Sequence, residues 1–162
     1  PTPAPPPTPT PTSEPSPSPT PTPPAPEPPP APAPPEPAPG AEVAIGYAFE
    51  QLNKPYEWGS DGPDLFDCSG FTKAAWRQAG VQLTHQSGAQ YDQLDKVPLA
   101  DAQRGDLLFY STDGTRAGIY HVAIYLGDGQ VIHSLRDWSS WNGVKVNPMN
   151  YVRGIMPDAG RP

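Results

Sequence analysis

The chain has 162 residues, 28 of them proline, and its formal net charge at pH 7 is −7. Binding to nucleic acid needs a concentrated basic surface, so this charge argues against nucleic acid as a partner. No apolar run approaches the roughly 20 residues of a membrane-spanning helix, and we expect no membrane span in this chain.

Residues 1–40 hold 22 of the 28 prolines and contain only Pro, Thr, Ala, Ser, Glu and Gly. Without aromatic or large aliphatic side chains, this segment cannot bury a core against the entropy of ordering. We predict a disordered, partly stiff linker of polyproline type, with a reach on the order of 100 Å. A passive tether is favoured over a partner-binding or glycosylated arm, because this composition is typical of linkers. Residues 41–162 have a normal length for one compact domain.

Helical periodicity dominates the first half of that domain. Residues 41–52 place Ile45, Ala48, Phe49 and Leu52 on one face, which predicts a first helix. A second helix follows an aromatic loop, and a short third helix is expected over about residues 86–94.

The second helix begins beside Cys68, the only cysteine in the chain. Asp67 is a competent N-cap, and Gly80 suits the position just after the helix. The unpartnered N–H groups at a helix start stabilise negative charge, so this position is expected to lower the pKa of a thiol from its free value of about 8.5. Position alone is equally compatible with a nucleophile and with a small buried core residue.

The second half of the domain has the periodicity of strands. We predict strands at residues 105–110, 120–126, 130–134, 143–146 and 151–156. The sequence Gly127-Asp128-Gly129 between the second and the third of these is a strong hairpin signal. Helices followed by antiparallel strands indicate an α+β domain with a sheet of about five strands.

A cysteine nucleophile needs a base within hydrogen-bonding distance, and the base needs a third group that fixes its tautomer. His121 begins one hairpin strand and His133 ends its partner, so their rings can meet on one face of the sheet. We predict His121 as the base and His133 as the group that holds its imidazole. Backbone-bonded histidines and a zinc site with Cys68 are the alternatives, although the spacings resemble no metal motif. His85 is interpreted as a surface or groove residue without a catalytic role.

Five ordered blocks of the domain resemble the NlpC/P60 family of cell-wall cysteine peptidases. They are Tyr56-x-Trp58-Gly59, Asp67-Cys68-Ser69-Gly70-Phe71, Gly105-Asp106-Leu107-Leu108-Phe109, His121-Val122-Ala123-Ile124-Tyr125-Leu126-Gly127 and Ile132-His133-Ser134. The resemblance covers essentially all of residues 41–156. It departs at Gly59-Ser60, where the family usually has two glycines, and at Leu83-Thr84-His85, where Pro and a basic residue are frequent. Both departures bear on substrate preference rather than on chemistry.

The resemblance implies a papain-like α+β fold and hydrolysis of the stem peptides of peptidoglycan, commonly between D-γ-glutamate and the diamino acid at position three. It implies that Cys68 is the nucleophile, His121 the base and His133 the third polar residue. No metal or cofactor is expected in this chemistry.

Three further residues are candidate binding groups on the same resemblance. Tyr56, with the backbone N–H of Cys68, would line the oxyanion site, while Asp67 and Ser69 would contact the stem peptide. The residues themselves leave other roles open, namely capping of the second helix for Asp67 and Ser69 and loop packing for Tyr56.

We therefore expect a secreted peptidoglycan hydrolase of the bacterial cell wall that acts as a monomer. The linker would hold it away from an anchor or a further N-terminal domain. A non-catalytic wall-binding module is one alternative, and an amidase or cross-bridge endopeptidase on the same fold is another. The presence of both Cys68 and His121 favours the enzyme, because non-catalytic members tend to lose one of the two.

Overall fold

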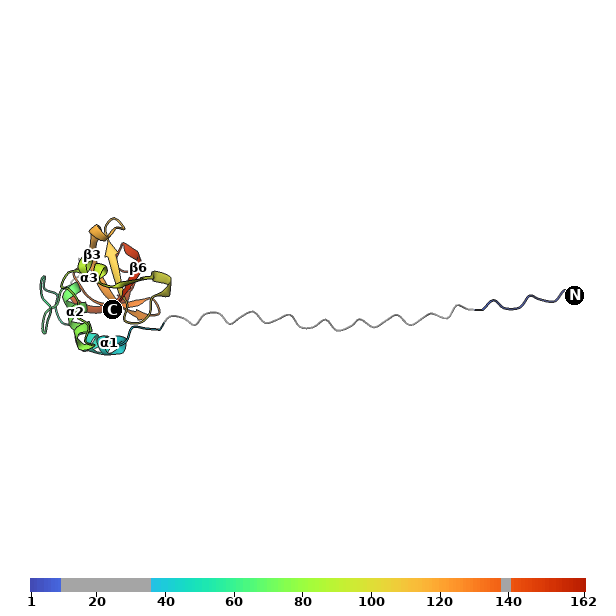
Figure 1. Ribbon diagram of the computed structural model, residues 1–162, viewed down its shortest axis with the longest axis horizontal. Coiled ribbons are helices and arrows are strands. Elements are labelled where there is room, and N and C mark those ends of the chain that lie inside the picture. The colour runs from blue at the N-terminus through green and yellow to red at the C-terminus, as the bar shows by residue number, and fades with distance from the viewer. Residues whose placement is uncertain (10–35, 138–140) are drawn as a thin grey trace. The chain divides into compact units, whose positions relative to one another are not determined.

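The computed structural model describes residues 1–9, 36–137 and 141–162. The chain divides into two units after residue 32. In the first unit, residues 1–9 are exposed and lie in no helix or strand (Figure 1). The linker predicted for residues 1–40 falls largely on residues 10–35, which lie outside the described residues, so the linker stays a prediction.

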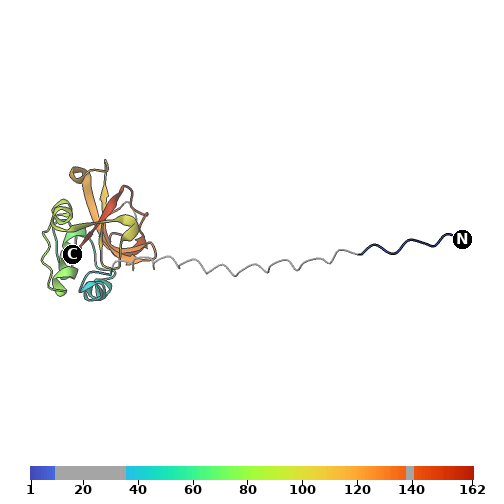
Figure 2. The ribbon, with the colours of Figure 1, turned by 45° about the vertical axis from the view of Figure 1, so that its right-hand side comes forward.

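In the second unit, the described residues form three α-helices and one antiparallel sheet, which confirms the predicted α+β class. The helices are α1 (Ala41–Glu50), α2 (Cys68–Gln78) and α3 (Ser87–Gln93), with two short 3-10 helices, η1 (Leu99–Asp101) and η2 (Arg116–Gly118). The strands are β1 (Asp95–Pro98), β2 (Leu107–Ser111), β3 (Ile119–Gly127), β4 (Gln130–Leu135), β5 (Gly143–Pro148) and β6 (Ile155–Arg161). They form one six-stranded sheet in the order β1-β6-β2-β3-β4-β5, and the helices gather on one side of it (Figures 1 and 2). None of the described helices has the length and apolar character to cross a bilayer.

Two strands differ from the sequence-based prediction. The prediction of a last strand at residues 151–156 is correct for Ile155 and Met156 but wrong for residues 151–154, because residues 151–153 form a bend and Gly154 takes a left-handed φ of 80°. The chain enters the sheet only from Ile155, as β6. The sequence does not predict strand β1, because its four residues show no apolar alternation. The strand forms by pairing with β6.

The main core lies between the helices and the sheet. Phe71 and Trp76 of α2 pack there with Phe109 of β2 and Ile124 of β3, and all four side chains are fully buried. A second apolar cluster includes Leu108, the neighbour of Phe109 in β2. Because residues of both clusters alternate along β2, the strand reads in the sequence as a continuous apolar run.

Backbone and side-chain hydrogen bonds fix the loop that leads into α2. The N–H of Asn53 donates to the carbonyl of Val144 at 3.0 Å, which ties the start of the loop to β5. At its other end, the buried hydroxyl of Ser134 donates to the carbonyl of Phe66 at 2.7 Å. Ser134 follows His133 in β4, so the start of α2 is held next to the strand that carries this histidine.

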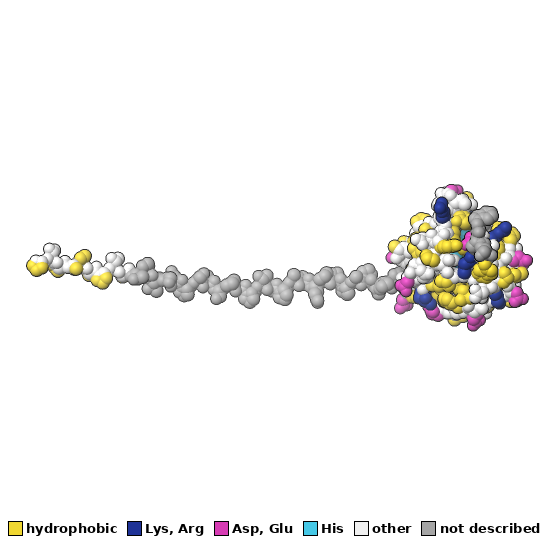
Figure 3. Space-filling model, turned by 180° about the vertical axis from the view of Figure 1, so that it is seen from behind, with side chains coloured by type: hydrophobic (Ala, Val, Ile, Leu, Met, Phe, Trp, Pro, Cys, Tyr) yellow, Lys and Arg dark blue, Asp and Glu magenta, His cyan; other side chains and the backbone are white. Residues whose placement is uncertain are grey.

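The described surface of the domain carries both signs of charge. On the face in Figure 3, Lys and Arg side chains are scattered among acidic and neutral ones. Arg104 is paired with Glu42 at 2.8 Å, and Arg116 is paired with Asp92. The face in Figure 3 therefore lacks the concentrated basic surface that phosphate binding requires.

Candidate functional site

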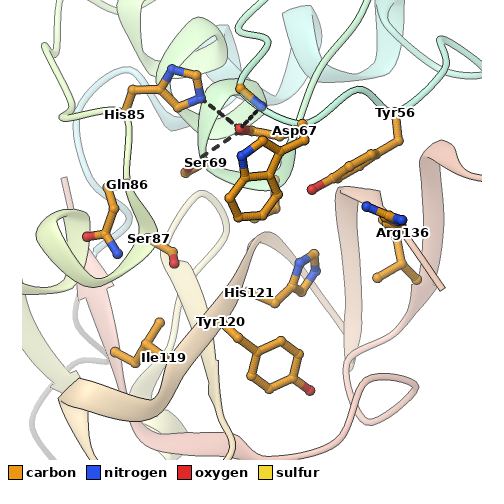
Figure 4. A pocket seen from close by; sticks show the side chains of 14 residues that line it. Tyr56, Asp67, Ser69, His85, Gln86, Ser87, Ile119, Tyr120, His121 and Arg136 are labelled. Atoms are coloured by element: carbon orange, nitrogen blue, oxygen red, sulfur yellow. Dashed lines mark hydrogen bonds and ion pairs between the residues drawn. The ribbon is translucent and has the colours of Figure 1, made fainter.

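A cavity of about 640 Å³ opens between the start of α2, the loop before α3 and the first residues of β3 (Figure 4). Five of the six predicted site residues line it, namely Tyr56, Asp67, Cys68, Ser69 and His121. The sixth, His133, is fully buried and contacts the cavity only through His121. The fold thus brings together residues that are up to 77 positions apart in the chain, from Tyr56 to His133.

Cys68 is the first residue of α2 and is 9% exposed. The expectation of a lowered thiol pKa is wrong for the free protein. Burial and the nearby Asp67 carboxylate raise the pKa of Cys68 to about 11, although the backbone N–H groups of Val122, Ser69 and Cys68 itself act to lower it. Helix-start donors thus act in the predicted direction but are outweighed by desolvation, so the resting thiol is protonated.

The contact with Val122 brings the sulfur beside the strand that carries His121. Within the described residues, no hydrogen bond joins the Cys68 thiol to the His121 ring, but both groups line the same cavity. Catalytic hydrogen bonds of this kind are often loose in the free enzyme and tighten when substrate binds.

The two histidines meet as their positions in the hairpin predict. His121 Nε2 lies 2.9 Å from His133 Nδ1. In the β3–β4 register Ile124 is opposite Ile132, which places the two histidines diagonally across the strands and on one face. Burial and the neighbouring His133 hold the pKa of His121 well below 6.5, and burial lowers the pKa of His133 to about 4. Both rings are therefore neutral at neutral pH.

His133 makes a further contact that reaches the next strand. Its Nε2 lies 3.0 Å from Oδ1 of Asn147 in β5. Because His121 uses Nε2 toward His133, its Nδ1 is the nitrogen left for the thiol.

A zinc site would need at least three ligand side chains grouped around one point. Within residues 1–9, 36–137 and 141–162, no three His, Cys, Asp or Glu side chains are grouped in this way.

Asp67 caps α2 and also ties three other groups together. Its Oδ1 accepts a hydrogen bond from the Gly70 N–H at 2.6 Å, and its Oδ2 accepts one from the Gly59 N–H at 2.9 Å. His85 Nε2 lies 2.9 and 3.0 Å from the two carboxylate oxygens, as the dashed lines in Figure 4 indicate. The hydroxyl of Ser69 lies 3.4 Å from Oδ1. The capping role is confirmed, and the groove position of His85 is confirmed as part of the cavity wall.

Tyr56 directs its hydroxyl into the cavity beside Arg136 (Figure 4). Burial, with the nearby Cys68 and Asp67, raises the pKa of Tyr56 to about 12, and Arg136 opposes this shift. The phenol therefore keeps its proton at neutral pH and can donate a hydrogen bond to a group in the cavity.

Two residues of the site escaped the sequence reasoning. Asn147 contacts His133 only because β5 pairs with β4, with His133 opposite Lys145. Predicting the contact between Asn147 and His133 requires the register of the β4–β5 pair, which the sequence does not determine. Arg136 directly follows β4 and belongs to no motif, so no local signal marked it.

In this α+β domain a cysteine at a helix start and a histidine of the adjacent strand line one cavity, and a second histidine is hydrogen-bonded behind the first. This is the arrangement of a cysteine nucleophile, a base and a group that orients the base. Residues 53–152 match the model of the NlpC/P60 family. The chain belongs to this family.

Among curated relatives, the chain is 46% identical over 103 residues to a probable endopeptidase p60 of Listeria seeligeri, covering 64% of this chain and 18% of the relative. It is 36% identical over 101 residues to a gamma-D-glutamyl-L-lysine dipeptidyl-peptidase of Bacillus cereus, covering 62% of this chain and 30% of the relative. The chain therefore spans less than a third of the length of these relatives.

Among solved structures, the NlpC/p60 domain of the peptidoglycan hydrolase SagA matches with a TM-score of 0.65 and 32% identity, covering 75% of this chain and 98% of that domain. RipD of Mycobacterium tuberculosis, described as a non-catalytic NlpC/p60 domain protein adapted to peptidoglycan binding, matches with a TM-score of 0.62 and 31% identity, covering 75% and 95%. Proteins with this fold thus include hydrolases and a binding protein. The residues of the site are therefore needed to distinguish these two functions.

Proposed function

We propose that this domain hydrolyses the stem peptides of peptidoglycan, at the bond between D-γ-glutamate and the diamino acid at position three. The single observation that carries the proposal is the cavity that contains the Cys68 thiol and the His121 ring, with His133 hydrogen-bonded behind that ring. The relatives named as endopeptidases support a peptidase, and the name of the Bacillus cereus relative supports this bond. The same substrate implies a location at the bacterial cell wall.

The reaction starts from a neutral thiol and a neutral imidazole. When a peptide carbonyl occupies the cavity, Nδ1 of His121 takes the proton from Cys68 while the sulfur attacks the carbonyl carbon. The backbone N–H of Cys68 and the Tyr56 hydroxyl donate hydrogen bonds to the oxyanion that forms. The protonated His121 then gives its proton to the leaving amine, and water hydrolyses the thioester in a second step with His121 again acting as base.

The cavity wall formed by Asp67 and Ser69, opposite His121, contacts the peptide. Asp67 is held by the N–H groups of Gly59 and Gly70 and by His85, so it offers the substrate a rigid polar surface and no freely rotating carboxylate. Ser69 lines the cavity beside it, and its hydroxyl can donate to a peptide carbonyl.

Arg136 is the proposed partner of a substrate carboxylate. It is exposed, it lines the cavity, and none of the described residues forms an ion pair with it. A glutamate linked through its γ-carboxyl keeps its α-carboxyl free, and arginine binds such a group with charge-assisted hydrogen bonds. Arg136→Gln is expected to raise KM about tenfold for a stem peptide with a free α-carboxyl, and to leave kcat unchanged.

Two controls accompany this prediction. Arg153→Gln removes an exposed arginine outside the cavity lining and should leave KM unchanged. A stem peptide in which the same α-carboxyl is amidated should be bound equally by wild type and Arg136→Gln. If the variant weakens binding of both peptides to the same extent, Arg136 does not recognise that carboxyl.

The proposed function is tested by digesting defined muropeptides with the full chain and identifying the products by mass spectrometry. We expect fragments that end in D-glutamate, and none with Cys68→Ala. An amidase would instead release the intact stem peptide from the sugar, and a cross-bridge endopeptidase would convert dimers into monomers with complete stems. Cosedimentation with peptidoglycan without any fragment would favour the wall-binding module.

A further inference from the structure

Three polar side chains form a hydrogen-bonded row across three neighbouring strands. His121 in β3 contacts His133 in β4 at 2.9 Å, and His133 contacts Oδ1 of Asn147 in β5 at 3.0 Å. His121 is 4% exposed and His133 is fully buried, while Asn147 is half-buried. The row therefore runs from the reaction cavity to β5, the edge strand of the sheet, and Asn147 is its outer end.

A neutral imidazole carries one proton, on either Nδ1 or Nε2, and the hydrogen bonds around it decide which. The oxygen of Asn147 can only accept, so His133 must carry its proton on Nε2. His133 Nδ1 is then a lone pair and must accept from His121, so His121 carries its proton on Nε2. Nδ1 of His121 is left with a lone pair, which is the state a base requires.

Reversing the direction of these hydrogen bonds shows why the residue at position 147 matters. If a donor took the place of the Asn147 oxygen, His133 would carry its proton on Nδ1 and would donate it to His121 Nε2. His121 would then carry its own proton on Nδ1 and could not accept one from Cys68. His133 is fully buried, so no water competes with Asn147 at its ring. The charged groups that act on His133 are Lys145, which lowers its pKa, and Asp137, which raises it.

We propose that Asn147 is a positioning residue, which through its side-chain oxygen sets the tautomers of His133 and His121 and leaves Nδ1 of His121 as the proton acceptor. The role assumes the proposed function of His121 as base. The tautomers themselves, however, can be measured without any substrate.

The neutral amide is the suitable group at this position, and a carboxylate is not. An aspartate at position 147 would stabilise a proton on both nitrogens of His133, because an opposite charge at this distance raises the pKa of a histidine by about one to three pH units. Doubly protonated His133 donates from Nδ1 to His121 and forces the unproductive tautomer. Asn147→Asp, although nearly isosteric, should therefore shift the acid limb of kcat upward by about one to three pH units.

The first measurement is the protonation of the ring nitrogens, by two-bond ¹H–¹⁵N NMR on the ¹⁵N-labelled full chain at neutral pH. The chain has three histidines, so variants that remove one ring at a time assign the signals. In the wild type we expect protonated Nε2 and bare Nδ1 for both His121 and His133. Asn147→Ala should give a mixture of tautomers and lower kcat about tenfold with little change in KM.

The second measurement is the pH profile of kcat for Asn147→Asp and for Asn150→Asp. The second variant adds the same charge at an exposed position three residues away, and it should leave the profile unchanged. A His121 protonated at Nδ1 in the wild type would overturn the proposal, and so would an unshifted acid limb in Asn147→Asp. If the wild type shows the expected tautomers but cleaves no muropeptide, the proposed function fails while the role of Asn147 in setting the tautomers stands.

Discussion

His121→Gln is expected to lower kcat about 10³-fold, because a positioned general base contributes roughly 10²- to 10⁴-fold. Glutamine fills much of the space of the ring and can still bond to His133, but it cannot take the proton of Cys68. Product release from a defined stem peptide, followed by mass spectrometry, measures the effect. The double variant with Cys68→Ala should be no slower than Cys68→Ala alone, because the two residues act as one unit. A loss of less than tenfold in His121→Gln would exclude it as the base.

The protonation of His121 also determines how the activity falls at acidic pH. His121 works only when neutral, so activity is present above its pKa and is lost as the pH falls through it. Burial and His133 hold the pKa of His121 well below 6.5, so we expect the acid limb of the wild-type profile to lie below that value. Burial also raises the pKa of Cys68 to about 11, so the thiol and the imidazole are both neutral from pH 7 to about 9. Because His121 takes the thiol proton during the attack, this protonation state is the reactive one, and the rate should be flat over that range. A limb at the ordinary histidine pKa would show that His121 is hydrated in the working enzyme.

The parts of the site that could be predicted are those with a local signal. Asp67 is an N-cap residue directly before a helical pattern, so the position of Cys68 at a helix start followed from adjacent residues. The turn at residues 127–129 fixes the β3–β4 pairing within a few residues, and this was enough to bring His121 and His133 together.

The parts that could not be predicted depend on contacts between distant segments. β1 and β6 stabilise each other by pairing, and neither has a clear strand pattern of its own. Asn147 enters the site through the β4–β5 register. The raised pKa of Cys68 results from burial by the whole domain, which a helix-start argument cannot weigh against the N–H donors.

Gly70→Ala should destabilise the domain by about 2–4 kcal/mol, because it forces backbone apart inside a packed contact. Gly70 lies in the first turn of α2, where a Cβ would stand 2.2 Å from the carbonyl oxygen of Ser60 and 2.9 Å from Cα of Asp61. It would also stand 2.9 Å from Nε2 of His85, the atom that contacts Asp67. The site should therefore lose activity together with stability.

A matched control separates this contact from the general effect of alanine in a helix. Gly46 lies in α1, and a Cβ there would meet no atom within 4 Å. Gly46→Ala should therefore raise the free energy of unfolding by about 0.5–1 kcal/mol, since alanine is favoured over glycine in a helix interior. Urea unfolding of both variants gives the comparison, with the midpoint of Gly70→Ala shifted down and that of Gly46→Ala shifted up. If both variants gained stability, the loop at Ser60 would be free to move away from α2, and close packing would not be the reason for glycine after Ser69.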